Sequence, residues 1–181
     1  MVTSQHSDID VVVKKILQVS KQGQKEYITK VKVISRLRHR NLVRLLGWSH
    51  DRGQFMLVYE FMQNGSLDSH LFSKNCALTW DMRYKICLGL VNALDYLHKN
   101  WEQCMVHRDI KTANVMLDSK FNVKLGDFRL GYMAPEYIKT GRPSCKSDVF
   151  SFGVVSLKIV CNTPNPYPSP EYDYKALPYK T

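Results

Sequence analysis

The residues best suited to chemistry begin in a polar segment at positions 107–114, which reads HRDIKTAN. A hydroxyl that accepts a phosphoryl group needs a carboxylate within hydrogen-bond reach, and Asp109 can supply it. Lys111 can neutralise charge on the transferring phosphate. Asn114 offers an amide oxygen, a ligand type that the hard cation Mg²⁺ prefers. The segment therefore predicts phosphoryl-transfer chemistry, with Asp109 and Lys111 as catalytic residues.

A second carboxylate, Asp127, follows in the tripeptide Gly126-Asp127-Phe128. It comes directly after the second strand of an expected hairpin, which places it across from the loop that carries Asp109. In that position it can hold a magnesium ion between phosphate groups. We therefore predict Asn114 and Asp127 as the metal ligands.

The elements that must position these residues follow from hydrophobic periodicity and from turn residues. Ile86, Leu90 and Leu94 recur at helical spacing, and Thr79 is placed to cap the start of their helix. The expected strands cover residues 10–17, 42–48, 55–61, 115–117 and 123–125, and the expected helices cover 22–37, 80–98 and a mostly apolar, buried 149–160. Strands with one helix, followed mostly by helices, predict a two-part α+β fold.

Composition narrows the classes of function. The net charge is +10, but lysines and arginines are spread along the sequence without a long basic run, so we expect no nucleic-acid partner. No stretch approaches the roughly 20 apolar residues of a membrane span, and residues 1–10 lack the apolar core of a signal peptide. The five cysteines are scattered and form no Cys-x-x-Cys pair, which argues against a zinc site or a disulfide framework. These features are typical of a cytoplasmic protein.

Together the two motifs resemble those of protein kinases, and other segments fit that resemblance. Val13-Lys14 resembles the kinase strand whose lysine binds the α- and β-phosphates of ATP. Residues 57–62, LVYEFM, resemble the kinase hinge, in which Tyr59 would be the gatekeeper and the backbones of Glu60 and Met62 would pair with adenine. The resemblance thus implies ATP and Mg²⁺ as cofactors, bound by Lys14, Glu60, Met62, Asn114 and Asp127.

Two later segments also fit the resemblance. Residues 134–136, APE, resemble the end of the activation segment. Residues 147–153, SDVFSFG, resemble the start of the central kinase helix, whose aspartate, here Asp148, braces the catalytic loop. Lys111 within that loop points to the serine/threonine class. The resemblance therefore implies phosphoryl transfer from ATP to serine or threonine of a protein substrate or of a partner kinase.

The residue sequences of segments such as HRDIKTANVMLD are similar to those of plant receptor-like kinases, most of all to those of the legume-lectin-domain group. The parent proteins of that group sit at the plasma membrane with a cytoplasmic kinase domain. The resemblance covers about residues 9–161 and implies an incomplete two-lobe kinase fold. We expect a polar N-terminus at 1–8, a partial N-lobe with the hinge at 9–62, a partial C-lobe at 63–161 and a disordered tail rich in proline and tyrosine at 162–181.

Four departures from the kinase pattern stand beside these matches. Only thirteen residues precede Lys14 and none of them is glycine, so the first two strands and the glycine-rich loop over the phosphates do not fit there. The family's helix glutamate falls on Lys30, whose charge would repel Lys14. Arg129 replaces the glycine expected after Phe128, and only four residues separate it from Ala134, which is too few for an activation segment. The resemblance ends after residue 161, without the last helices of the large lobe.

A smaller departure is Val12, which stands where the family usually has alanine and would crowd the adenine base. Together the departures leave three hypotheses open. The chain is a serine/threonine kinase of impaired activity, a catalytically impaired, pseudokinase-like binding module, or a non-functional truncated gene product. Phosphate transfer that depends on Asp109 favours the first hypothesis over the other two.

Overall fold

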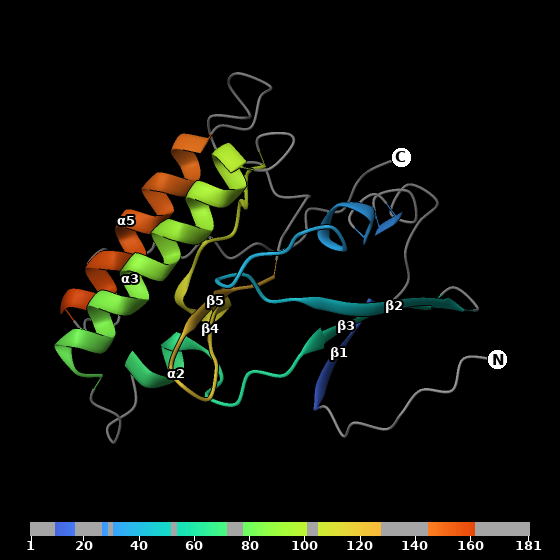
Figure 1. The fold of residues 1–181 in the computed structure, drawn as a ribbon, viewed down its shortest axis with the longest axis horizontal. Coiled ribbons are helices and arrows are strands. Elements are labelled where there is room, and N and C mark those ends of the chain that lie inside the picture. The colour runs from blue at the N-terminus through green and yellow to red at the C-terminus, as the bar shows by residue number, and fades with distance from the viewer. Residues whose placement is uncertain are drawn as a thin grey trace, which may run out of the picture.

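The computed structural model describes residues 10–16, 27–28, 31–51, 54–71, 78–100, 105–127 and 145–161. The strands are β1 (Val11–Ile16), β2 (Leu45–Asp51), β3 (Gln54–Glu60), β4 (Val115–Leu117) and β5 (Val123–Leu125). The helices are α2 (Leu67–Leu71), α3 (Trp80–Asp95), the π-helical turn η1 (Tyr96–Asn100), the 3₁₀ turn η2 (Thr112–Asn114) and α5 (Cys145–Cys161). Figure 1 shows a three-stranded sheet on one side and the pair α3 and α5 on the other, with the β4–β5 hairpin between them. This division confirms the predicted two-part α+β arrangement.

The three-stranded sheet carries the first of the predicted site residues. Its order is β1-β3-β2 with antiparallel pairs, and Lys14 lies opposite Leu57. Because side chains alternate between the two faces of a strand, Val12 and Lys14 share a face. The buried Tyr27 packs against Phe55 with ring centroids 4.5 Å apart, which fixes a short helical segment against the sheet.

That helical segment ends earlier than predicted, at residue 34 instead of 37. Of the expected helix at 22–37, the structure describes residues 27–28 and 31–34 as helical, followed by a turn. The amide of Leu37 donates to the carbonyl of Ile34 at 3.1 Å, an i→i−3 bond that tightens the chain out of the α-helix. Lys30, the residue at the family's glutamate position, lies outside the described residues.

The second strand also begins later than predicted, at Leu45 instead of residue 42. Arg44 still bonds to Glu60 of β3, but residues 41–43 bond to the hairpin instead. The amide of Val43 donates to the carbonyl of Leu125 at 3.0 Å, and the amide of Leu125 donates to the carbonyl of Asn41 at 2.8 Å. Segment 41–43 therefore ties the three-stranded sheet to β5, which ends at the predicted metal-site residues.

Helix α3 agrees with its prediction. The side-chain oxygen of Thr79 accepts from the amide of Met82 at 3.4 Å, which confirms the N-cap. The side chains at the predicted apolar positions Ile86, Leu90 and Leu94 are buried. The chain then continues into the π-helical turn η1, slightly beyond the predicted end. This rigid helix forms the support on which the hairpin and its neighbouring loop lie.

Helix α5 lies beside α3 (Figure 1) but is not the buried helix that we predicted. It begins at Cys145 and buries Asp148, Val155 and Ile159. Phe150 is 74% exposed and Val160 is 51% exposed, because no described element packs against that side of the helix. In the part of the chain that the structure describes, neither this helix nor any other is both long and apolar enough to cross a membrane.

The contact that joins α5 to the polar loop is the carboxylate of Asp148, which is 1% exposed. Its oxygens accept from the amides of His107 at 2.7 Å and Arg108 at 2.9 Å, and they lie 2.9 Å from Nε2 of His98. Charged acceptors form strong hydrogen bonds, and a buried carboxylate is costly unless it is so compensated. Asp148 therefore holds the loop in place, as the sequence predicted.

Asp148→Ala should lower the free energy of unfolding by more than about 2 kcal/mol, because it leaves buried donors without an acceptor. Urea unfolding of the purified chain measures the change. Asp95→Asn is the matched control, since Asp95 pairs with Lys99 at the surface, where solvent screens the interaction and its loss should change stability little. Equal losses for the two variants would contradict the role given to Asp148.

Two helix glycines should respond in opposite directions to substitution by alanine. A Cβ on Gly89 would lie 2.2 Å from Cγ1 of Val123, so Gly89→Ala should destabilise by about 1–3 kcal/mol through overpacking of α3 against β5. A Cβ on Gly153 in α5 meets nothing within 4 Å. Gly153→Ala should therefore stabilise by about 0.5–1 kcal/mol, the usual helix preference. Thermal unfolding tests both, and a stabilised Gly89→Ala would contradict the close packing of α3 on β5.

Candidate active site

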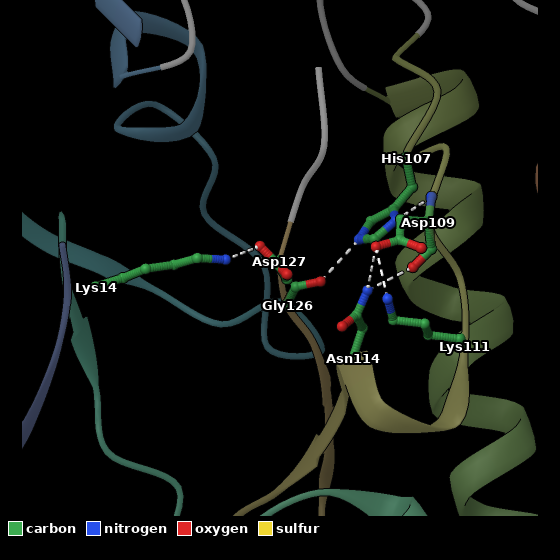
Figure 2. A network of polar contacts seen from close by, with 7 residues as sticks. All are labelled: Lys14, His107, Asp109, Lys111, Asn114, Gly126 and Asp127. Atoms are coloured by element: carbon green, nitrogen blue, oxygen red, sulfur yellow. Dashed lines mark hydrogen bonds and ion pairs between the residues drawn. The ribbon is translucent and has the colours of Figure 1, made fainter. Parts of the chain in front are cut away.

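Lys111 and Asn114 of the HRDIKTAN segment converge on the carboxylate of Asp109 (Figure 2). Oδ2 of Asp109 accepts from Nζ of Lys111 at 3.1 Å and from Nδ2 of Asn114 at 2.9 Å. The same Nδ2 also donates to the backbone carbonyl of Asp109 at 2.7 Å. Turn η2 makes this possible, because it folds Asn114 back toward the loop. The carboxylate of Asp109 is thus fixed in direction and stays partly exposed, at 20%.

His107 connects this loop to the end of β5. Its imidazole is 1% exposed, Nδ1 accepts from the amide of Asp109 at 3.3 Å, and Nε2 donates to the carbonyl of Gly126 at 2.9 Å. These partners assign the tautomer with hydrogen on Nε2. Burial lowers the pKa of His107, so the ring is neutral at pH 7. The ring therefore acts as an uncharged spacer between Asp109 and residues 126–127.

The backbone at two of these positions adopts a left-handed conformation. Arg108 has φ 69° and Asp127 has φ 53°, values that residues other than glycine seldom adopt. Such conformations persist where the surroundings over-determine them, and they concentrate at functional sites. At Arg108 the amide is held by Asp148, and before Asp127 the carbonyl of Gly126 is held by His107.

Asp127 meets a lysine from the opposite sheet. Nζ of Lys14 in β1 lies 2.5 Å from Oδ1 of Asp127, and the side chains are 48% and 26% exposed. Figure 2 shows the lysine reaching across from its strand to the end of β5. An ion pair this exposed stabilises the fold only modestly, by less than about 1 kcal/mol. A cationic ligand for Asp127 or an anionic ligand for Lys14 can therefore replace it.

A cavity of about 270 Å³ lies between the two sheets and brings together four of the predicted site residues. Its walls are Val12, Lys14, Val43, Tyr59, Glu60, Phe61, Met62, Gly65, Met116, Gly126 and Asp127. The walls are mostly apolar, and Lys14 and Asp127 place two charges at one part of the lining. An apolar pocket with a few convergent polar groups is the usual form of a small-molecule site.

The predicted hinge residues line this cavity, but the side chain of Glu60 has another role. Its Oε1 accepts from Nζ of Lys124 at 2.8 Å and from the amide of Arg44 at 2.7 Å. The carbonyl of Met62 accepts from the amide of Gly65 at 3.0 Å, in a turn where that glycine has φ +64°. Sequence reasoning missed the Glu60–Lys124 pair, because the partners are 64 residues apart with no local pattern to signal them.

Several predicted features lie outside the described residues: Phe128, Arg129, the APE segment at 134–136, the N-terminus at 1–8 and the tail at 162–181. Within the described part, no group of three or more His, Cys, Asp or Glu side chains could hold a metal ion by itself. Asp127 supplies one carboxylate and Asn114 one amide oxygen. A metal at this position would therefore complete its coordination with water or with oxygen atoms of a bound ligand.

A sequence profile of the protein tyrosine and serine/threonine kinase family matches residues 1–131 and 128–177. The match extends beyond the resemblance that we expected over residues 9–161. It comes in two pieces that meet near Arg129, where the sequence analysis placed the missing part of the activation segment.

Individual plant proteins are similar over most of this chain. L-type lectin-domain containing receptor kinase IX.1 of Arabidopsis thaliana is 58% identical over 172 residues, covering 84% of this chain and 26% of the relative. Receptor kinase IX.2 of the same plant is 53% identical, covering 83% and 25%, and SIT1 of Oryza sativa subsp. japonica is 45% identical, covering 86% and 26%. The chain thus spans about a quarter of the length of these relatives.

The alignment with the first relative also measures what this chain lacks internally. Because 84% of 181 residues is about 152, an alignment of 172 positions includes about 20 at which the relative has a residue and this chain has none. A break of that size agrees with the short connection predicted after Arg129. With a profile that matches nearly its whole length and relatives that are more than half identical, this chain belongs to the protein tyrosine and serine/threonine kinase family.

Proposed function

We propose that the cavity between the two sheets binds ATP with Mg²⁺, and that the chain transfers the γ-phosphate slowly to serine or threonine of a protein. The observation that carries the proposal is the cavity itself. It gathers Lys14, Asp127 and the hinge residues, and the His107–Gly126 hydrogen bond joins its wall to the loop that carries Asp109. Nothing local in the sequence requires these separate segments to meet around one hollow.

The apolar part of the cavity suits an adenine base. Val43 and Met116 offer apolar surface, and Val12 adds a wall that a smaller residue would leave open. Burial, with the nearby charge of Asp127, raises the pKa of Tyr59, so its hydroxyl stays protonated. The amide of Glu60 is used by the carbonyl of Arg44 at 3.2 Å, so the proposal assigns adenine pairing to the Glu60 carbonyl and to the backbone of Met62.

The polar part of the cavity suits a magnesium ion held jointly with phosphates. Nδ2 of Asn114 is turned to Asp109, and Figure 2 shows its amide oxygen directed away from that residue. Asp127 supplies a partly exposed carboxylate. These are hard oxygen ligands, and Mg²⁺ is commonly bound by one or two such groups plus substrate phosphates. When bound, the ion neutralises negative charge on the phosphates.

The remaining residues act on the acceptor hydroxyl and on the phosphate that is transferred to it. Asp109 accepts the proton of the substrate hydroxyl, and its direction is set by Asn114 and by the amide contact with His107. Lys111 lies on the same carboxylate and can turn its charge to the transferring phosphate. With nucleotide and metal bound, Lys14 would hold phosphate oxygens and Asp127 would serve as a metal ligand, so their present ion pair would have to separate.

The proposed rate is low because Lys14 lacks the partner that the family gives it. The position of the helix glutamate holds Lys30 in this sequence. Lys14 pairs with Asp127 instead, so two groups needed by the nucleotide neutralise each other. Loss of one preorganised charge stabiliser lowers turnover on the order of 100- to 1000-fold.

The same ion pair favours a second candidate function, a kinase-like module that binds partners without catalysis. If Lys14 and Asp127 stay paired, the cavity keeps its shape but offers no free charge to phosphate or metal. Nucleotide binding and phosphate transfer separate the two candidates.

Thermal unfolding in the presence of ATP and Mg²⁺ should raise the midpoint by about 5 °C at saturating ligand, because only the native state binds. ATP with a chelator should give a smaller shift. Lys14→Met should lose most of the shift, whereas Lys15→Met, on the other face of β1, should keep it. An equal shift in both variants would place the nucleotide elsewhere, and a chain without a cooperative transition would support the truncated-product hypothesis.

Phosphate transfer to a generic basic protein should be detectable with radiolabelled ATP but fall well below the usual 1–100 per second. Asp109→Asn should reduce it by a further factor of about 100 or more, the typical contribution of a general base, while leaving the nucleotide-induced thermal shift unchanged. Asp81→Asn, an exposed carboxylate in α3, is the control. Nucleotide binding without any transfer dependent on Asp109 would establish the second candidate instead.

A further inference from the structure

Two adjoining hollows of about 480 and 260 Å³ lie outside the cavity that contains Lys14. Both are lined by Arg40 and Lys124, so they form one continuous depression. We call it the basic groove and define it by the charged residues of its lining: Arg38, Arg40, Arg44, Lys85, Asp118 and Lys124. Three separate parts of the chain contribute them, namely the segment before β2, helix α3 and the β4–β5 hairpin.

The groove carries positive charge that the protein does not neutralise. Lys124 is paired with Glu60, but Arg40, Arg44 and Lys85 form no ion pair with any residue that the structure describes. The one carboxylate of the lining, Asp118, accepts from the amide and the side chain of Asn122 in its own turn, at 2.8 and 2.9 Å. Burial opposes ionisation of Asp118, but these hydrogen bonds outweigh it and lower its pKa, so the carboxylate serves the turn.

Asn41 and Gly89 line the groove where α3 packs closely on β5. Nδ2 of Asn41 donates to the carbonyl of Val123 at 2.9 Å, and Gly89 brings α3 into close contact with the same strand. Asn41 is 8% exposed and its Oδ1 is buried without a hydrogen-bond partner in the described part of the chain. Protein atoms cover this oxygen, so what the groove offers to a ligand is its exposed cations.

We propose that the basic groove binds an extended phosphorylated segment of a partner protein. Guanidinium groups such as those of Arg40 and Arg44 bind phosphate through paired hydrogen bonds, and both side chains are exposed. Because the groove is concave, the side chains of a peptide can enter it, whereas the flat surface of a membrane cannot. The proposal does not rest on nucleotide binding or on phosphate transfer by this chain.

The lining fits single-stranded nucleic acid less well. Such ligands are bound by aromatic rings on which bases stack. The aromatic side chain of the lining is His39, whose ring already stacks on Tyr96 with centroids 4.8 Å apart.

The test measures fluorescence anisotropy of the full chain with a labelled peptide of about twelve residues, composed of glycine, alanine and aspartate around two phosphoserines. The expected dissociation constant is micromolar, with at least about tenfold weaker binding of the peptide that has serine at both positions. Arg40→Glu combined with Lys85→Glu should also weaken binding about tenfold or more, because both side chains are exposed cations of the groove. Lys15→Glu, an exposed charge reversal in β1, should leave binding unchanged.

A thermal unfolding curve of each variant checks that it is folded, and Arg40→Gln replaces the double variant if that one is not. Equal binding of phosphorylated and unphosphorylated peptides would overturn the proposal, as would equal binding by the groove variant and the Lys15 control. A labelled single-stranded RNA, or vesicles containing phosphatidylserine, provides the remaining comparison. If either binds more tightly than the phosphopeptide and loses binding in the groove variant, the groove serves that ligand class and the proposal is wrong.

Discussion

Asp148 places a carboxylate in the interior of the molecule, where an uncompensated charge would cost several kcal/mol. Two backbone amides of the catalytic loop and the ring of His98 compensate it. From there an unbroken series of contacts continues through His107 to the carbonyl of Gly126, and from Asp127 to Lys14 in the opposite sheet. Helix α5, the loop, the hairpin and β1 thus depend on one another through polar contacts, although they are far apart in sequence. The left-handed backbone at Arg108 and Asp127 is tolerated because this series holds both sides of the loop.

The sequence predicted those parts of the fold whose signals are local. Thr79 caps α3 because its hydroxyl needs only the amide three residues on, and the hairpin forms around a turn closed by Asp118. The sequence also indicated that Asp109, Lys111 and Asn114 act together, because all three lie within one short loop. The predictions were wrong where the structure depends on hydrogen-bond or packing partners that are far apart in the sequence. Residues 41–43 bond to β5 instead of β3. Helix α5 exposes an apolar side, because periodicity shows that a face is apolar without showing what packs against it.

The charges illustrate the same limit. Lysines and arginines are spread along the sequence without a long basic run, which gives no sign of a clustered basic surface. Folding instead gathers Arg40, Lys85 and Lys124 from three parts of the chain around one depression. The interpretation of Lys14 changed for a related reason. Its motif predicts a phosphate ligand, and among the described residues its ammonium group pairs with the carboxylate of Asp127. Motifs identify which residues can do chemistry, and the surrounding charges decide which partner each takes.

The cavity and the basic groove share one ion pair. Glu60 lines the cavity and Lys124 lines the groove, and Oε1 of Glu60 accepts from both Nζ of Lys124 and the amide of Arg44. The pair is about four-fifths buried on each side, at 19% and 24% exposure, so solvent screens it less than a surface pair. An anion beside Lys124 competes with Glu60 for the same ammonium group. If the Glu60 side chain then moves, the backbone of the same residue, which lies at the cavity, can move with it. Coupling between two binding sites is reciprocal by thermodynamic necessity. If a ligand in the cavity displaced Glu60, it would change the binding free energy of an anion in the groove. The anion would change the binding free energy of the cavity ligand by the same amount.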